Sequence, residues 1–238
     1  MIPWLHPIHL IFPDTATALD EPDGLLAAGG DLSPNRLLAA YRQGIFPWFS
    51  ADDPILWWSP NPRCVLFPDQ IHISRSMRKH IKKSHYKVTF DRAFSEVIQA
   101  CASTRETSTG TWISEEMQVA YNELHQKGYA HSVEVWENQQ LIGGLYGLGI
   151  VKLYFGESMY SLQKNASKIA FIALCQQLKR WGYPLVDCQV HNSHLESLGA
   201  TNIPRNDFID YIRHYIDSTT SHDWHFDKDN VILDSGSG

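Results

Sequence analysis

The sequence lacks the short motifs that bind nucleotides or generate a covalent nucleophile. No Gly-x-x-x-x-Gly-Lys-Ser/Thr loop occurs in the 238 residues, and no Gly-x-Gly-x-x-Gly follows an expected strand. These absences argue against ATP hydrolysis and against a bound dinucleotide. A Gly-x-Ser-x-Gly nucleophile elbow is also missing. We therefore expect chemistry that uses no cofactor and no obvious covalent nucleophile.

Cysteine is scarce and shows no framework spacing. The four cysteines are Cys64, Cys101, Cys175 and Cys188. Such scattered thiols are typical of a reduced protein in the cytosol. The chain has 12 histidines, but the densest group, Cys188, His191 and His194, lacks a paired Cys-x-x-Cys and a His-Glu-x-x-His. Zinc sites commonly depend on such pairs, so we expect no metal site.

Long apolar runs are absent as well. No stretch is apolar for long enough to span a bilayer, and the amino-terminal segment is interrupted by Pro3 and Pro7 and lacks the basic region of a signal peptide. The net charge of −6 argues against a protein that coats nucleic acid in bulk, although it allows a local basic patch. We expect a cytoplasmic monomer that does not contact a membrane.

Two unequal domains are expected, with the boundary at Asn61-Pro62-Arg63. Residues 1–63 form a small unit rich in proline and aromatic residues, whereas residues 64–238 alternate between strand and helix patterns. The larger unit runs strand, helix, strand, helix, helix, three strands, helix, strand, helix, helix. That order predicts an α/β fold with a mixed sheet and helices on both faces.

Aromatic residues are concentrated in the first third of the chain, where seven fall between Tyr41 and Phe67. A small domain with little area to bury can use large rings as its core. Alternatively, some of the rings can face a groove and act as stacking platforms for bases. Composition favours the core for most of them and leaves the role of each ring open.

One basic stripe stands out in this acidic protein. Its five members are Arg75, Arg78, Lys79, Lys82 and Lys83. Their offsets place them on one face of a helix that Ser74 can cap. A solvated helix face is the ordinary explanation of such a stripe. However, no acidic residues interleave to neutralise it, so contact with nucleic-acid phosphates is the alternative hypothesis.

A second candidate region lies around Glu157. The apolar runs Leu141–Ile150 and Val151–Phe155 predict two paired strands, and a helical pattern begins at Ala166. The segment Gly156–Ser161 is therefore expected where a strand gives way to a helix, a common position for ligand sites in α/β sheets. The competing interpretation is an ordinary helix start capped by Ser161 or Asn165.

A third candidate region is the strand that contains Asp187 and Gln189. The two polar residues alternate with Cys188, so both side chains are expected to face one way and the thiol the other. Adjacent polar groups at a strand end are costly unless they bond to each other or to a ligand. They are either a structural pair that caps nearby backbone or part of a site.

Several blocks together resemble the leucyl/phenylalanyl-tRNA–protein transferase family. The blocks are Glu21-Pro-Asp-Gly-Leu-Leu-Ala-Ala-Gly-Gly-Asp-Leu32, Tyr41-Arg-Gln-Gly-Ile-Phe-Pro-Trp48, Trp57-Trp-Ser-Pro60, Gly156-Glu-Ser-Met159 and Asp187-Cys-Gln189. The match covers about residues 1–216 in the right order. It implies a bacterial enzyme that moves Leu or Phe, and Met less well, from aminoacyl-tRNA to proteins beginning with Arg or Lys, which marks them for degradation. It also implies an N-acetyltransferase-like (GNAT) carboxy-terminal domain.

The resemblance also implies roles for individual residues. Trp48 and Trp112 would flank the terminal adenine of the tRNA, with Tyr41 and Tyr121 close by. Helical spacing groups Ala170, Leu174 and Leu178, and the resemblance adds Leu145, Met159 and Val186 to the same amino-acid pocket. Gln189 would accept a hydrogen bond from the attacking amine and Asp187 would polarise that amine. Glu157 would hold either the aminoacyl group or the cationic side chain of the acceptor. The family pattern leads us to expect Met and Phe at positions 145 and 174, so the relative preference among Leu, Phe and Met stays open.

Two alternatives remain at this point. An acyl-CoA-dependent acetyltransferase would share the sheet-and-helix core, but the entry of the central helix, Leu162-Gln-Lys-Asn-Ala166, contains no glycine of the kind a pyrophosphate loop needs. A non-catalytic RNA-binding module would use the basic stripe and the aromatic rings, but it would leave Glu157 and the Asp187–Gln189 pair without a purpose.

Overall fold

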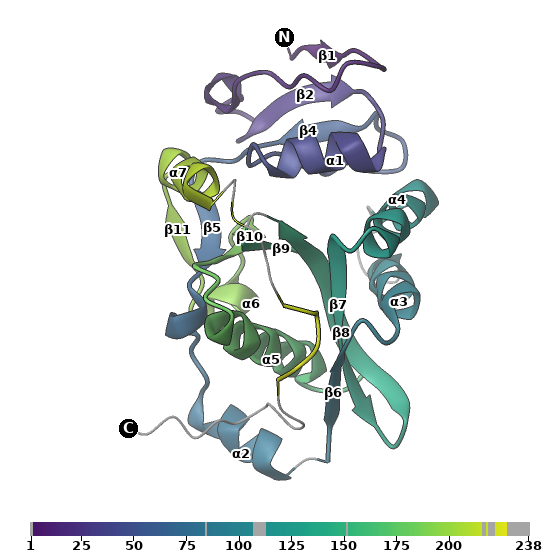
Figure 1. The fold of residues 1–238 in the computed structure, drawn as a ribbon, viewed down its shortest axis with the longest axis vertical. Coiled ribbons are helices and arrows are strands. Elements are labelled where there is room, and N and C mark those ends of the chain that lie inside the picture. The colour runs from purple at the N-terminus through teal and green to yellow at the C-terminus, as the bar shows by residue number, and fades with distance from the viewer. Residues whose placement is uncertain are drawn as a thin grey trace.

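A computed structural model describes residues 2–83, 85–106, 113–150, 152–215, 218 and 222–227. In this part of the chain the strands form two separate sheets, one of four strands and one of seven. The smaller sheet sits at one end of the molecule, above the larger sheet and its helices (Figure 1). Along the described residues, no helix combines the length and the apolar character needed to cross a membrane.

The amino-terminal sheet has the strand order β1-β2-β4-β3. Its elements are β1 (Trp4–Leu5), η1 (Thr15–Thr17), β2 (Leu25–Gly29), α1 (Pro34–Tyr41), β3 (Phe46–Pro47) and β4 (Leu56–Trp58). Helix α1 is capped at its start, because Ser33 Oγ accepts a hydrogen bond from the Arg36 backbone N–H and Pro34 occupies the first turn. The chain leaves this helix through Gly44, whose φ of 74° suits glycine.

The larger sheet has the order β11-β5-β10-β9-β8-β7-β6, and only β9 and β10 run parallel within its described strands. Its strands are β5 (Arg63–Leu66), β6 (Lys87–Phe90), β7 (Ala130–Glu137), β8 (Gln140–Ile150), β9 (Leu153–Ser161), β10 (Val186–Gln189) and β11 (Thr201–Ile203). The remaining elements are η2 (Pro68–Gln70), α2 (Arg75–Lys83), α3 (Phe94–Glu106), α4 (Glu115–Gln126), α5 (Ala166–Arg180), α6 (Ser193–Glu196) and α7 (Arg205–Tyr215). The predicted mixed α/β architecture is confirmed.

Two hydrophobic clusters cover the two faces of this sheet. Side chains alternate along a strand, and on β8 Leu145 packs in the cluster that contains most of α5, whereas Tyr146 packs in the cluster that contains residues of α3 and α4. The second of these clusters also contains Leu26 and Trp57 of the amino-terminal sheet. The small sheet therefore shares one core with the α3–α4 face of the large sheet.

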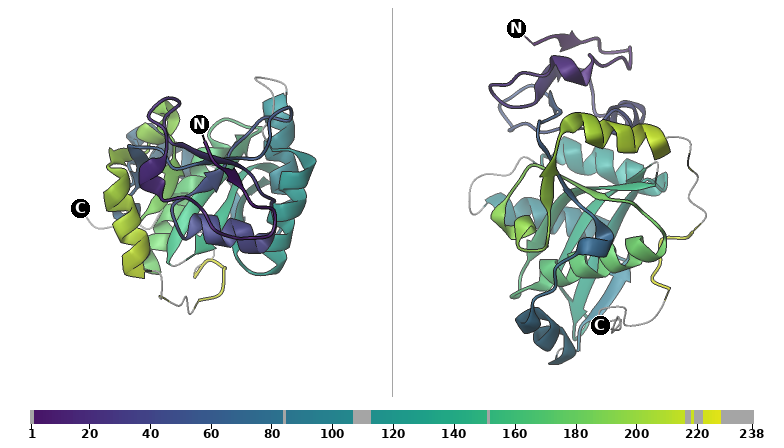
Figure 2. Two further views of the ribbon diagram at one scale, coloured as in Figure 1. Left: turned by 90° about the horizontal axis from the view of Figure 1, so that it is seen from above. Right: turned by 90° about the vertical axis from the view of Figure 1, so that its left-hand side faces the viewer.

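Helix α7 lies at the side of the molecule where the two sheets meet, as the right-hand view in Figure 2 shows. A side chain on Gly44 would lie 2.5 Å from Ile209 of α7, so the glycine allows this close approach. The change from the small to the large sheet falls between Trp58, where β4 ends, and Arg63, where β5 begins. The division into domains 1–63 and 64–238 stays a prediction.

Two features differ from the expectations. Strand β9 continues through Ser161, so Glu157 lies inside a strand rather than at the predicted strand-to-helix exit. Strand β11 was not predicted, because three residues with an exposed edge carry almost no sequence pattern.

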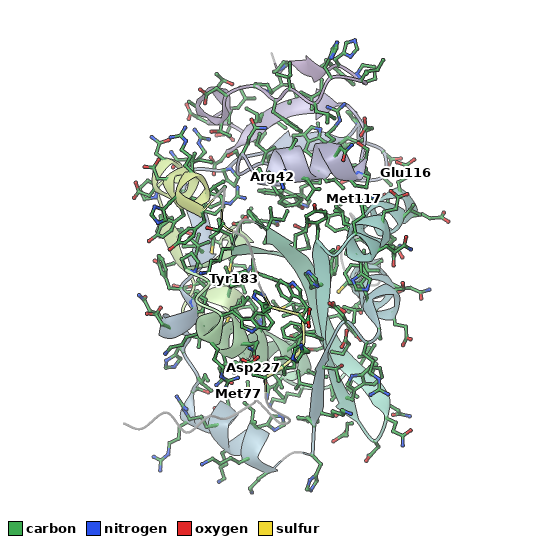
Figure 3. The ribbon with its side chains drawn as sticks, viewed as in Figure 1. Arg42, Met77, Glu116, Met117, Tyr183 and Asp227 are labelled. Carbon is green, nitrogen blue, oxygen red and sulfur yellow. The ribbon has the colours of Figure 1, made fainter. Side chains whose placement is uncertain are left out.

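Residues 222–227 pack on the larger sheet and its central helix. Trp224 stacks on His131 of β7 with ring centroids 3.7 Å apart. Asp227, labelled in Figure 3, accepts a 2.6 Å hydrogen bond from Gln177 of α5.

Candidate functional site

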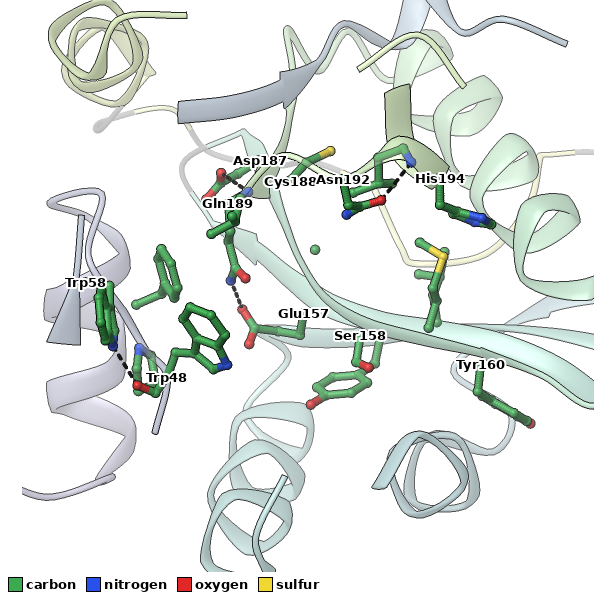
Figure 4. Close-up of a pocket in the computed structure, with 18 of the residues that line it drawn as sticks. Trp48, Trp58, Glu157, Ser158, Tyr160, Asp187, Cys188, Gln189, Asn192 and His194 are labelled. Carbon is green, nitrogen blue, oxygen red and sulfur yellow. Dashed lines mark hydrogen bonds between the residues drawn. The ribbon is translucent and has the colours of Figure 1, made fainter. Parts of the chain in front are cut away.

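A cavity of about 1290 Å³ lies between the amino-terminal sheet and strands β9 and β10. Its walls come from β3, β4 and the loop between them, from β8 to β10, and from α5 and α6. Glu157 and Gln189 meet on one wall, with Trp48 and Trp58 on the neighbouring wall (Figure 4). The amino-terminal sheet therefore completes a site whose polar groups lie on the larger sheet.

Two adjacent strand irregularities create the polar wall. Strands β9 and β10 are paired at Tyr154–Val186 and Phe155–Asp187. Beyond these pairs, β9 bulges against β8 at Glu157, since Tyr146 pairs with Ser158 but Gly147 pairs with Gly156. A bulge inserts one extra residue and re-aims its side chain. A side chain on Gly147 would lie 2.2 Å from the Phe155 carbonyl oxygen, so this register depends on glycine.

Strand β10 has the matching irregularity. Asp187 pairs with Val65 and Gln189 pairs with Cys64, which leaves Cys188 as the extra residue. Gln189 adopts a left-handed conformation with φ 61°. Asp187 and Gln189 point to one side and the Cys188 sulfur to the other (Figure 4). The predicted orientation of these three side chains is thus seen, although a bulge rather than a regular strand produces it.

Glu157 is buried at the centre of a cluster of hydroxyl and amide groups. Its Oε1 accepts hydrogen bonds from the Tyr41 hydroxyl at 2.6 Å and from Gln189 Nε2 at 2.9 Å, and its Oε2 lies 3.0 Å from the Tyr121 hydroxyl. The two tyrosine hydroxyls are 2.5 Å apart. Burial raises the pKa of Glu157 to about 8, and its hydrogen bonds to Tyr41, Tyr121 and Gln189 only partly offset that rise.

The charge of Glu157 follows from these surroundings. Tyr41 and Tyr121 each donate a hydrogen bond to its carboxyl group. Burial raises the pKa of each phenol well above its ordinary value, so both stay protonated and neutral. Because neither phenol brings a positive charge, burial outweighs these bonds, and with a pKa of about 8 Glu157 is largely neutral at pH 7.

Asp187 has a different partner. Its oxygens accept hydrogen bonds from Arg63 Nε at 2.8 Å and Nη2 at 2.7 Å, and both side chains are fully buried. Asp187 Oδ1 also accepts a 2.9 Å hydrogen bond from the backbone N–H of Gln189. The family resemblance predicts that Asp187 polarises the attacking amine directly. In the structure, its carboxylate already accepts hydrogen bonds from three donors of the protein itself.

The apolar part of the cavity contains half of the predicted amino-acid pocket. Leu145, Met159 and Val186 line it. Ala170, Leu174 and Leu178 do not; they are fully buried on the side of α5 that packs into the sheet core. Helix α5 contributes Ser167 and Phe171 to the wall instead. The i, i+4 spacing identified a buried helix face, but the cavity lies beside a neighbouring face of the same helix.

The predicted adenine-binding aromatics separate into two groups. Trp48 lines the cavity with 43% of its surface exposed, and its ring centroid is 5.6 Å from that of Trp58. Tyr41 and Tyr121 are fully buried and are not on the cavity wall, so they are not available to stack on a base; their hydroxyls hold Glu157. Trp112 lies outside the described residues.

The basic stripe forms as predicted on α2. Arg75, Arg78, Lys79, Lys82 and Lys83 are exposed. Met77 and Ile81 are buried on the opposite face of the helix and anchor it to the core. Helix α2 lies at the end of the molecule opposite the amino-terminal sheet (Figure 1). Contact between this stripe and phosphates stays a prediction.

Three further polar atoms at the cavity were not predicted as part of the site. Ser158 Oγ, the Tyr160 hydroxyl and His194 Nε2 are buried and have no hydrogen-bond partner within the described chain, and all three residues line the cavity. Buried polar groups are costly unless a ligand or water satisfies them. Ser158 and Tyr160 flank Met159 in a block already singled out, so alternation along the strand was their one available signal. In the same described ranges, no three His, Cys, Asp or Glu side chains group closely enough to hold a metal ion.

Comparison with known proteins gives a consistent set of matches. The family "Leucyl/phenylalanyl-tRNA protein transferase" matches residues 65–213, and the N-terminal domain of that family matches residues 30–61. A protein from Cellvibrio japonicus named leucyl/phenylalanyl-tRNA–protein transferase is 55% identical over 95% of this chain and 96% of its own length. A protein of the same name from Pseudomonas fluorescens is 57% identical over 94% of this chain and 99% of its own length.

A solved structure with partial likeness is that of L-PGS from Bacillus licheniformis. It is 12% identical, with a TM-score of 0.40, over 70% of this chain and 53% of the other.

Proposed function

Because the chain belongs to the leucyl/phenylalanyl-tRNA–protein transferase family, we propose that the cavity beside Glu157 and Gln189 is its aminoacyl-transfer site. The protein is an aminoacyltransferase that moves Leu or Phe, and Met less well, from aminoacyl-tRNA to proteins that begin with Arg or Lys. The product carries a new amino-terminal residue that marks it for degradation.

The reaction needs positioning more than activation. The α-amine of the acceptor attacks the ester carbonyl carbon, the new C–N bond forms as the ester C–O bond breaks, and the amine proton passes to the departing ribose oxygen. An amide is more stable than an ester, so neither ATP nor a metal is required. A free α-amino group has a pKa of about 8, and a useful fraction is neutral near pH 7. Holding ester and amine in line can remove about 7–11 kcal/mol of barrier.

The main support for this assignment is the hydrogen bond that holds the side-chain amide nitrogen of Gln189 against Glu157. Gln189 Nε2 donates to Glu157 Oε1 at 2.9 Å, and Gln189 lines the cavity. This bond directs the Gln189 carbonyl oxygen away from Glu157 as an acceptor for an N–H of the attacking amine. A Gln oxygen is a weak base, so its role is to aim the lone pair of the amine at the carbonyl carbon.

Glu157 contributes as a neutral group. With its pKa raised to about 8 by burial, it is mostly protonated at pH 7 and a poor partner for a cationic side chain. Its three neutral partners instead fix it as an anchor for Gln189. Of the two roles expected for Glu157, holding the aminoacyl group or the cationic side chain of the acceptor, a neutral carboxyl group disfavours the second.

The remaining walls fit the donor. Leu145, Met159, Val186 and Phe171 provide an apolar surface for a Leu or Phe side chain, and a flexible Met adapts to both shapes. Trp48 offers an exposed ring on which the terminal adenine can stack. The α2 stripe supplies phosphate contacts that position the tRNA without reading its sequence.

The wider expectations are part of the same proposal. The parallel pairing of β9 and β10 beside α5 supports a GNAT-like core for residues 64–238, preceded by the domain of residues 1–63. We propose that the enzyme acts in the cytoplasm as a monomer.

A donor competition tests the function. Labelled Leu-tRNA and labelled acetyl-CoA are offered in parallel to a peptide that begins with Arg, with a peptide that begins with Gly as the control acceptor. We expect label on the Arg peptide from Leu-tRNA alone. Transfer from acetyl-CoA alone would identify an acetyltransferase, and no transfer at all would indicate a non-catalytic RNA-binding protein.

A further inference from the structure

We propose that Arg63 is a positioning residue for aminoacyl transfer, which acts through Asp187 to hold Gln189 in its working conformation. The inference rests on the proposed function of the cavity. Arg63 belongs to none of the motifs that point to the site, and it lies 124 residues before Asp187 in the chain.

The Arg63 guanidinium group is held from every side. It lies over the Phe46 ring at 4.8 Å and over the Phe208 ring at 4.6 Å from the ring centroids. Its Nη1 donates a 3.1 Å hydrogen bond to the Gly44 carbonyl oxygen, and its Nε and Nη2 form the two-pronged contact with Asp187. A planar fork of this kind fixes the orientation of a carboxylate, which a lysine ammonium cannot do.

The fixed carboxylate in turn determines the backbone at Gln189. Asp187 Oδ1 accepts hydrogen bonds from both Arg63 Nε and the backbone N–H of Gln189. Gln189 has φ 61°, a conformation that side-chain-bearing residues seldom adopt without support. The hydrogen bond that the Gln189 backbone N–H donates to Asp187 supplies that support. In this conformation the Gln189 side chain lies within reach of Glu157. Arg63 thus fixes the Asp187 carboxylate, and the carboxylate fixes the backbone of Gln189. That backbone sets the position of the Gln189 side-chain amide, which faces the substrate.

The same residue links the site to the rest of the fold. Gly44 and Phe46 belong to the amino-terminal part, Phe208 belongs to α7, and Asp187 belongs to β10. The amino-terminal part therefore does more than cover the cavity: through Arg63 it supports the strand bulge that presents Gln189.

The test compares Arg63→Lys with Arg36→Lys. Arg36 is a matched control because it is also fully buried and bonds to Asp31 and to backbone carbonyls, but it has no contact with the cavity wall. Both variants are expected to lower the melting temperature. Only Arg63→Lys is expected to lower kcat for Leu transfer, by about 10- to 100-fold as for a misaligned reactive group. The KM for Leu-tRNA should change by less than about twofold.

A double-mutant cycle separates positioning from folding. In a Gln189→Ala background, Arg63→Lys should cause no further loss of kcat, because it acts through the side chain already removed. Phe208→Leu tests the same positioning in a second way, because it removes one ring packed on the Arg63 guanidinium group but keeps the ion pair with Asp187. It should lower kcat by about threefold when Gln189 is present and should have no effect on kcat in the Gln189→Ala background.

The outcomes divide cleanly. Equal losses of kcat in Arg63→Lys and Arg36→Lys, or additive losses in the Gln189→Ala background, would make Arg63 a structural residue only and overturn the inference. If Arg63→Lys yields no folded protein, the Phe208→Leu cycle decides by the same criterion. Full activity of Gln189→Ala alone would instead overturn the assignment of the cavity itself.

Discussion

Glu157 and Asp187 are two buried carboxyl groups on neighbouring strands, and the protein stabilises them in opposite ways. Asp187 is paired with a guanidinium group at 2.7 and 2.8 Å. Glu157 receives only two phenols and an amide, so burial keeps its pKa near 8 and a proton removes its charge at pH 7. Both solutions avoid an uncompensated buried charge, whose cost would be several kcal/mol.

The difference explains which group can face substrate. The Asp187 carboxylate is paired with Arg63 and accepts three of the about four hydrogen bonds that a carboxylate can take, all from the protein. Glu157 is neutral, so it can hold the Gln189 amide without attracting the acceptor's amine as a competing ion pair. Gln189 connects the two carboxyl groups, because its backbone N–H donates to Asp187 and its side-chain Nε2 donates to Glu157.

The largest expected effect comes from breaking the ion pair. Arg63→Met leaves the Asp187 charge buried and unpaired, and it should lower the free energy of unfolding by about 3–5 kcal/mol. The double variant Arg63→Met/Asp187→Asn removes both charges and should recover at least half of that loss. Urea denaturation at pH 7 measures both. No recovery in the double variant would mean that packing of the Arg63 side chain, rather than its charge, carries the stability.

Glu157→Gln tests the other carboxyl group through pH. Its folded pKa of about 8 is raised above 4.5, so its contribution to stability is fully present below about pH 4.5 and is lost as the pH rises to about 8. The variant should gain about 2–4 kcal/mol of stability relative to the natural protein between pH 5 and pH 8.

The measurement for Glu157→Gln is the difference between two pH profiles of unfolding free energy. Using the difference removes the contribution of Glu134, whose pKa burial also raises, to about 7. A pH-independent difference would show that Glu157 is charged in the folded protein at neutral pH.

The smallest effect is expected from Tyr41→Phe. It removes one hydroxyl that bonds to Glu157, and a hydrogen bond of this kind contributes about 1 kcal/mol to stability. Because that bond lowers the pKa of Glu157, the pKa should rise further in the variant, as followed by carboxyl NMR. Tyr183→Phe is the control, since its hydroxyl lies 3.5 Å from His222, whereas the side chains that bond to Glu157 are Tyr41, Tyr121 and Gln189. An unchanged pKa in Tyr41→Phe would contradict the arrangement of the cluster.

Local patterns allowed much of the fold to be predicted from the sequence. The Ser74 cap and the exposed basic stripe of α2, the pairing of β8 with β9, and the alternation around Cys188 are all short-range features. Each depends on residues within a few positions, so a single sequence contains the needed information.

The candidate site was only partly predictable because its geometry depends on distant contacts. The bulge at Glu157 requires the close approach of Gly147, and the Asp187 environment requires Arg63 from a strand 124 residues earlier. Tyr41 and Tyr121 were predicted near the terminal adenine, but in the structure both are buried and their hydroxyls bond to Glu157. Helical spacing alone could not tell the core face of α5 from the face that meets the cavity.

Single-turnover transfer by Gln189→Ala tests the central claim most directly. Enzyme saturated with labelled Leu-tRNA is mixed with an Arg-initiated peptide, and the rate of amide formation is compared with that of the natural protein. We expect a fall of about 100-fold in this rate with unchanged binding of Leu-tRNA, because the variant loses the group that aims the amine. A normal rate at saturation, with weakened Leu-tRNA binding, would contradict it.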